Sequence, residues 1–170
     1  MERVCAGISA VVEPVNFNSP GQIVIAGSTE GVKLASVALT AEKARVMALP
    51  VSAPFHSSLM RPAEERLAPV LDAVAFADPR VPVYVNVDAA PVTSGAAARD
   101  ALVRQVSRAV RWDEAIEAMV AAGVGVFVEI GPGKVLTGLL KRIDKNATAI
   151  SVQSMAELPA ARAALRAVRS

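Results

Sequence analysis

The order of apolar and polar positions in the first third of the chain predicts a hairpin, a helix and a strand. Residues 11–16 and 22–26 are rich in β-branched residues and are separated by the turn sequence Asn-Ser-Pro-Gly, which indicates a β-hairpin. Apolar residues at helical spacing predict a helix over residues 29–44, and residues 45–51 predict another strand. Residues 2–9 have the pattern of a helix end, and we expect further residues to precede them in the intact protein. This order corresponds to most of a ferredoxin-like βαββαβ module.

Strands alternate with helices over the rest of the chain, which indicates parallel pairing in an α/β layer. Residues 81–87 show the period-two alternation of a strand, and residues 124–130 form a short apolar run that also predicts one. Helical spacing of apolar residues predicts helices over residues 59–74, 96–107, 113–122, 134–143 and 158–168, and a last strand is expected over 148–152.

The composition is that of a folded protein, since 53% of the 170 residues are hydrophobic and 20% are charged. The net charge is +2, and the basic residues are scattered and accompanied by few aromatic ones, which argues against a nucleic-acid partner. The single cysteine, Cys5, excludes an internal disulfide and is compatible with a reducing cytoplasm. No run approaches the roughly 20 apolar residues of a membrane-spanning helix. We therefore expect a soluble, cytoplasmic protein with no membrane partner.

His56 is the only histidine in the chain, and it lies between the predicted strand 45–51 and the predicted helix 59–74. Histidine is the usual proton carrier near neutral pH, and junctions between strands and helices present side chains to clefts in α/β proteins. His56 is therefore a candidate general base, and a purely structural histidine is the alternative. No second histidine and no cysteine pair is present to complete a metal site.

Two glycine-containing sequences are excluded as catalytic motifs. Ser28 follows Gly27 directly, whereas the nucleophile elbow Gly-x-Ser-x-Gly needs an intervening residue, and this elbow occurs nowhere in the chain. The sequence Gly-Pro-Gly-Lys at residues 131–134 is followed by Val135, where a phosphate-binding loop needs Ser or Thr. We interpret residues 131–134 as a tight turn between a strand and a helix.

Four segments taken together resemble the C-terminal part of malonyl-CoA:acyl carrier protein transacylases, the loading enzymes of bacterial fatty acid synthesis. Their order and spacing agree with the family over nearly the whole chain. The resemblance implies an α/β fold, with an incomplete ferredoxin-like small subdomain over residues 1–52 and the C-terminal part of an α/β-hydrolase-like acyltransferase large subdomain over residues 53–170. The matching segments are residues 14–27 (PVNFNSPGQIVIAG), 49–60 (LPVSAPFHSSLM), 101–105 (ALVRQ) and 128–136 (VEIGPGKVL).

The resemblance also implies a reaction and a set of site residues. In the family, a serine in a Gly-His-Ser-x-Gly elbow accepts malonyl from malonyl-CoA and passes it to the phosphopantetheine thiol of acyl carrier protein, without a metal or cofactor. By resemblance, His56 is the general base, and the main-chain carbonyl of Gln105 orients its imidazole. Asn18 is implied to contact the substrate. Phe55 is implied to favour malonyl over acyl groups that carry a 2-methyl branch.

The elbow serine, the arginine for the malonyl carboxylate and the oxyanion-hole donors lie, in the family, upstream of the region that this sequence matches. We therefore expect this chain alone to be inactive, and one reading is a split acyltransferase whose other half carries the serine. The alternative is a non-enzymatic module that binds acyl carrier protein or coenzyme A through basic side chains. These side chains could equally form an ordinary solvated surface with no partner. The side chains considered are Arg104, Arg108, Arg111, Lys134, Lys141 and Arg142.

Overall fold

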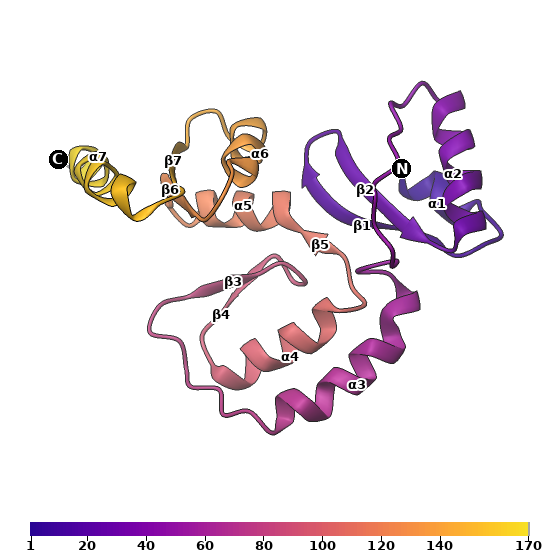
Figure 1. The fold of residues 1–170 in the computed structure, drawn as a ribbon, viewed down its shortest axis with the longest axis horizontal. Coiled ribbons are helices and arrows are strands. Elements are labelled where there is room, and N and C mark those ends of the chain that lie inside the picture. The colour runs from indigo at the N-terminus through magenta and orange to yellow at the C-terminus, as the bar shows by residue number, and fades with distance from the viewer. Residues whose placement is uncertain (170) are drawn as a thin grey trace.

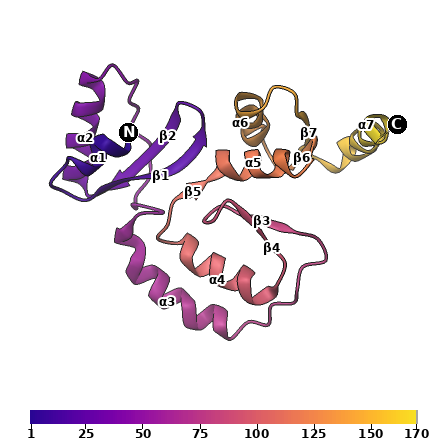
Figure 2. The same ribbon diagram turned by 180° about the vertical axis from the view of Figure 1, so that it is seen from behind.

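The structure, a computed structural model that describes residues 1–169, has the mixed α/β fold that the sequence predicts. Figure 1 shows three groups of elements: an N-terminal group, a central arc of helices with a small hairpin, and a C-terminal group that ends in a helix at the far end of the molecule. Figure 2 shows the same grouping from behind. Residue 170, the last residue of the expected large subdomain, lies outside the described residues.

The N-terminal group contains the predicted hairpin, packed against two helices. Strands β1 and β2 pair antiparallel, as expected, and β1 extends three residues further than the sequence indicates. Their apolar faces meet the helices in a small core of Cys5, Val12 and Ala35, and burial of the Cys5 thiol raises its pKa. The elements are α1 (Glu2–Ala6), β1 (Val12–Ser19), β2 (Gln22–Gly27) and α2 (Thr29–Ala41).

The prediction of a strand over residues 45–51 is wrong, because this segment has no regular secondary structure. Its run of apolar residues is compatible with a strand, but a strand forms only where a neighbour completes its hydrogen-bond ladder. No strand of residues 1–169 lies against it, and its apolar side chains are exposed: Met47 by 68% and Val51 by 63%. The ferredoxin-like order therefore stops after α2 in this structure.

The central group places two helices around a short antiparallel hairpin. Helices α3 and α4 contact each other, and strand β5 follows α4. Strand β4 was not predicted, because it is three residues long and contains Pro91. The elements are η1 (Ser58–Met60), α3 (Arg61–Asp72), β3 (Val83–Val85), β4 (Ala90–Val92), α4 (Gly95–Gln105) and β5 (Val110–Arg111).

Strand β5 returns to the N-terminal group and pairs parallel with β1, so that Asn16 lies opposite Val110 and Phe17 opposite Arg111. The resulting sheet has the order β2-β1-β5. It joins residues on both sides of the predicted subdomain boundary at residues 52 and 53, and that division stays a prediction.

The C-terminal group is a parallel two-stranded sheet with helices around it, and here the parallel pairing expected from the sequence is confirmed. Strand β6 pairs with β7 over five residues, from Val126 opposite Thr148 to Ile130 opposite Val152. The elements are α5 (Trp112–Ala121), β6 (Val126–Ile130), α6 (Val135–Ile143), β7 (Thr148–Val152), η2 (Met155–Glu157) and α7 (Leu158–Arg169).

The molecule exposes more surface than its mass requires. Its accessible area is 10,939 Å² for 17.6 kDa, whereas the usual scaling for a folded monomer gives about 7,900 Å². Part of the excess lies at β6, where Ile130 is 78% exposed at one end of the parallel sheet. Parallel sheets normally have both faces covered, so this group has an incomplete shell of neighbours.

Gly31 and Gly138 give a test of how closely α2 packs on β1. A Cβ at Gly31 would lie 2.3 Å from the carbonyl oxygen of Val11, whereas a Cβ at Gly138 in α6 has no atom within 4 Å. Helix propensity alone predicts that Gly→Ala stabilises at both positions by about 1 kcal/mol. Because of the clash, we expect Gly31→Ala to lower the free energy of unfolding by about 1–3 kcal/mol, and Gly138→Ala to raise it. Urea unfolding of both variants measures this; equal stabilisation by both would contradict the packing of α2.

Candidate active site

His56 occupies a turn between the unpaired segment 45–51 and the 3₁₀ turn η1. Its φ of +64° lies in the left-handed region, which non-glycine residues seldom adopt and which often occurs at functional sites. The next residue, Ser57, is fully buried, and its hydroxyl donates to the carbonyl of Pro54 at 2.6 Å. The turn is therefore anchored directly after His56, while the imidazole itself is only half-buried.

The imidazole of His56 contacts the main chain of Gln105, as the resemblance implies. His56 Nδ1 lies 2.8 Å from the Gln105 carbonyl oxygen, across 49 residues of sequence. A carbonyl oxygen can only accept, so Nδ1 carries the proton of the neutral ring and Nε2 keeps its lone pair. This is the tautomer that a general base needs. The catalytic role of His56 and Gln105 stays a prediction.

The carbonyl of Gln105 is held by its own side chain. Gln105 Nε2 donates to the carbonyl oxygens of Arg108 at 2.9 Å and Ala109 at 3.3 Å, which closes the turn between α4 and β5. Ser107 in the same turn donates its hydroxyl to Glu64 on α3. The amide side chain therefore fixes the backbone whose carbonyl faces His56, a function that its type and helical position did not indicate.

A second set of contacts holds the histidine side of the pair and was missed in the sequence. The carboxylate of Glu13, on β1, accepts hydrogen bonds from the Ser58 N–H at 3.0 Å and from the Ser58 hydroxyl. Glu13 is 45 positions from Ser58 in the sequence. It lies in a segment whose residue pattern predicts a strand and says nothing of a partner for its carboxylate. Nothing in the sequence pattern signals this contact.

The two predicted substrate residues lie at different places. Phe55 directly precedes His56, and its ring is half exposed, so it lies at the surface of the same turn. Asn18 lies near the tip of the β1–β2 hairpin, in a bulge where Phe17 pairs with Ile23 and Ser19 with Gln22. No direct contact joins Asn18 to His56 among the hydrogen bonds of residues 1–169. Their roles in substrate binding stay predictions.

Comparison with known proteins identifies the family. The family described as the acyl transferase domain matches residues 2–163. The chain belongs to this acyl transferase family. Malonyl CoA-acyl carrier protein transacylases of Salmonella typhimurium and Escherichia coli K12 are each 51% identical to it over 152 residues, which are 89% of this chain and 49% of each relative. The chain thus spans about half the length of the curated relatives it matches.

Solved structures agree with the sequence comparison. An acyl-carrier-protein S-malonyltransferase from Bartonella henselae is 40% identical, with a TM-score of 0.92 over 96% of this chain and 53% of its own. A malonyl transacylase in complex with a type II polyketide synthase acyl carrier protein is 47% identical, with a TM-score of 0.90 over 94% of this chain and 53% of its own. The fold of this acyl transferase chain therefore corresponds to about half of each of those structures.

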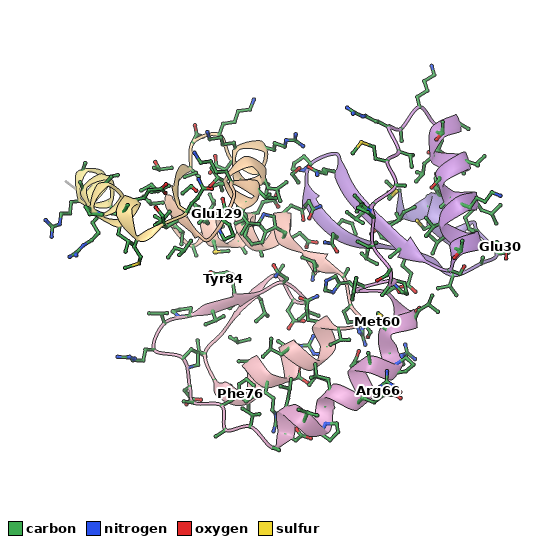
Figure 3. All side chains as sticks on the ribbon, viewed as in Figure 1. Glu30, Met60, Arg66, Phe76, Tyr84 and Glu129 are labelled. Carbon is green, nitrogen blue, oxygen red and sulfur yellow. The ribbon has the colours of Figure 1, made fainter. Side chains whose placement is uncertain are left out.

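The Gly-Pro-Gly-Lys sequence of this acyl transferase chain forms a turn, as interpreted from its residues. Gly131 and Gly133 have φ of +138° and +91°. The Glu129 carboxylate accepts from the N–H groups of Leu136 at 3.1 Å and Thr137 at 2.8 Å, and this hydrogen bonding, that of Thr137 above all, holds the pKa of Glu129 below its usual range. Figure 3 shows Glu129 beside α6. An acidic side chain thus occupies the position at which a phosphate-binding loop would hold its anion.

Metal and membrane sites are not found in the part of the chain that is described. No group of three or more His, Cys, Asp or Glu side chains within residues 1–169 is arranged to hold a metal ion. No helix of those residues has the length and apolar character that crossing a membrane requires.

Asp88 and Arg104 form the best-defined ion pair near the α4–β5 turn. Two guanidinium nitrogens of Arg104 donate to the two oxygens of Asp88 at 2.7 Å, and its Nε donates to Asp100 at 2.7 Å. Arg104 holds the pKa of Asp88 below its usual range, and Asp88 raises the pKa of Arg104. Arg111 is similarly paired with Glu114. Two of the six basic side chains considered for an acidic partner therefore have acidic neighbours within this chain.

The Asp88–Arg104 pair predicts a pH-dependent contribution to stability. Because the folded pKa of Asp88 is lowered, its stabilisation is complete above the usual Asp pKa of about 3.9 and is lost as the pH falls through the lower folded value. Asp88→Asn should reduce the free energy of unfolding at pH 7 by at most about 1 kcal/mol, since both side chains are partly exposed. The difference from the unsubstituted chain should shrink as the pH falls below the usual Asp pKa of about 3.9, and also in about 1 M salt. Chemical unfolding at pH 7 and at stepwise lower pH measures it, with Glu117→Gln on the exposed side of α5 as the control; a difference that does not decrease with pH would contradict the pair.

Proposed function

We propose that this chain supplies the general base of an acyltransferase that moves malonyl from malonyl-CoA to the phosphopantetheine thiol of acyl carrier protein. The observation that supports it is the contact between His56 Nδ1 and the Gln105 carbonyl at 2.8 Å, which leaves Nε2 able to accept a proton. The relatives named as malonyl CoA-acyl carrier protein transacylases, at 51% identity, support the choice of malonyl and of the carrier protein. The reaction needs no cofactor, and Cys5 is a free thiol, which suits a cytoplasmic protein.

The proposed reaction has two halves, and His56 transfers the same proton twice in each. Nε2 takes the proton of a serine hydroxyl as the serine oxygen forms a bond with the malonyl carbonyl carbon. The bond from that carbon to the coenzyme A sulfur then breaks, and the imidazolium returns the proton to the leaving thiolate. In the second half, Nε2 deprotonates the carrier-protein thiol and its sulfur forms a bond with the carbonyl carbon of the malonyl-serine ester. The bond from that carbon to the serine oxygen breaks, and the imidazolium returns the proton to this oxygen.

The serine of this reaction comes from residues outside the given sequence, since no Gly-x-Ser-x-Gly occurs in it. The surface in excess of the usual scaling, about 3,000 Å², is of the size that a large permanent interface buries. The unpaired segment 45–51 and the exposed end of β6 at Ile130 offer apolar positions for such contacts. We infer that residues equivalent to the unmatched half of the relatives complete the domain and bring the serine to His56.

Complementation tests this function directly. We expect the purified chain alone to transfer no malonyl to acyl carrier protein, and co-expression with the serine-bearing half of a relative to restore transfer. In the restored enzyme, His56→Ala should lower kcat/KM on the order of 10³-fold or more. Val37→Ala, at a 66% exposed position of α2, should leave it unchanged. Restored activity that survives His56→Ala would refute the assignment of the base.

Phe55 gives a test of acyl selection in the same restored enzyme. We propose that its ring, half exposed beside His56, crowds a 2-methyl branch on the acyl group. Phe55→Ser should therefore raise kcat/KM for methylmalonyl-CoA relative to malonyl-CoA by about 10-fold, the lower end of what one methylene-sized clash produces. Competition between the two substrates measures the ratio, with Leu59→Ser, a 42% exposed position of η1, as the control. An unchanged ratio would remove Phe55 from the acyl pocket.

A further inference from the structure

The contact between Glu13 and Ser58 is the link between strand β1 and the turn that carries His56. Glu13 lies opposite Ala26 in the β1–β2 ladder, so its backbone is fixed by the hairpin. Its two carboxylate oxygens are used separately, one by the Ser58 N–H and the other by the Ser58 hydroxyl. Hydrogen bonds to a carboxylate are about twice as strong as neutral ones. The start of η1, two residues after His56, is therefore bound to a rigid strand.

The His56 turn depends on such a contact because few others restrain it. The residues before it, 45–51, pair with no strand of the described chain and are largely exposed. His56 itself has a φ of +64°, a conformation that costs free energy unless neighbouring contacts enforce it. Within the turn, Ser57 is buried and bonds Pro54 through both its N–H and its hydroxyl, and the Met60 N–H donates to the Ser57 carbonyl. Besides the His56–Gln105 contact itself, the Glu13–Ser58 bonds are the hydrogen bonds that tie this turn to a strand of the described chain.

Strand β1 restrains the partner of His56 as well. Five residues after Gln105, strand β5 pairs with β1 at Asn16 and Phe17. Through Glu13, the turn that carries His56 is hydrogen-bonded to β1. The strand that follows the Gln105 carbonyl pairs with β1 too, so one strand restrains both partners of the contact. Acidic residues are depleted in strands, so the formation of β1 gives no reason for a glutamate at this position.

We propose that Glu13 is a positioning residue for His56: by holding Ser58 on β1, its carboxylate keeps the imidazole at the Gln105 carbonyl, with Nδ1 protonated and Nε2 free. This inference rests on the proposed role of His56 as the base. The test measures the tautomer of the imidazole itself. The positioning role of Glu13 and the catalytic role of His56 can therefore be refuted independently.

The tautomer of His56 is the measurement, because this is the only histidine and its ring signals are unambiguous. We suggest ¹⁵N labelling of histidine in this chain and NMR of the ring nitrogens near pH 8, about 1.5 units above the usual imidazole pKa. The unsubstituted chain should show the Nδ1–H tautomer. Glu13→Ala should shift the tautomer ratio toward Nε2–H by about fivefold, as expected when the contact that selects Nδ1–H is weakened. Ser58→Ala should shift it less, since the N–H bond remains.

Conservative and distant variants separate positioning from a general loss of stability. Glu13→Gln keeps one carbonyl acceptor and should restore most of the Nδ1–H population. Glu30→Ala removes an exposed carboxylate on α2, which Figure 3 places at the outer end of the N-terminal group, and should change nothing. If Glu13→Ala does not fold, Ser58→Ala decides the question, since it removes the hydroxyl bond to Glu13 and leaves the N–H bond in place.

The restored enzyme gives the second readout. Glu13→Ala should lower kcat by about 10-fold with the KM for malonyl-CoA unchanged, because the base is displaced and the substrate contacts are not. An unchanged tautomer ratio in Glu13→Ala and Ser58→Ala would overturn the proposal. A shifted ratio without any transferase activity in the restored enzyme would support the positioning role and refute the proposed reaction.

Discussion

The parallel pairing of β5 with β1 is the constraint on which the candidate site depends. The pairing joins the strand that follows the Gln105 carbonyl directly to the N-terminal hairpin, at Asn16 and Phe17. Strand β1 also contacts α1, α2, α5 and α6, so it is the element around which the first and last groups pack. His56 and Gln105 are 49 positions apart in the sequence. The turn that carries each of them is attached to β1, one through Glu13 and the other through β5, and this brings the two residues together.

The partner of the histidine is a main-chain dipole where many hydrolases have a carboxylate. A carbonyl selects the Nδ1–H tautomer as well as an aspartate does, because both can only accept a hydrogen bond. It carries no net charge, however, so it stabilises the imidazolium less. A backbone acceptor also cannot be adjusted by rotating a side chain, so its position depends on the turn that Gln105 Nε2 closes onto Arg108 and Ala109.

Local patterns predicted most elements of this fold, and the errors have one physical cause. The hairpin, the helices and the β6–β7 pair follow from periodicity and turn residues within about fifteen positions. The strand over 45–51 is missing because its pattern indicates only that a strand is possible, while the ladder needs a partner. The role of the Gln105 carbonyl was predicted only from the family resemblance. Every residue has a main-chain carbonyl, so the residue type at this position cannot indicate that role. The Glu13–Ser58 contact could not be found at all, because a strand carboxylate and a loop serine each have an ordinary explanation.

In the proposed reaction, the base His56 and the carbonyl of Gln105 belong to this chain, whereas the given sequence has no Gly-x-Ser-x-Gly to supply the nucleophile. The contacts that fix His56 come from β1, from Ser57 and from the α4–β5 turn, all within the described residues. The contact that favours the Nδ1–H tautomer is therefore formed within this chain alone. By contrast, the apolar positions of 45–51 and Ile130 are open to solvent, so the free energy of their burial is available only when further polypeptide covers them. In the proposed function, covering these apolar positions and orienting the base are thus separate: the first needs further polypeptide, and the second depends on hydrogen bonds present within residues 1–169.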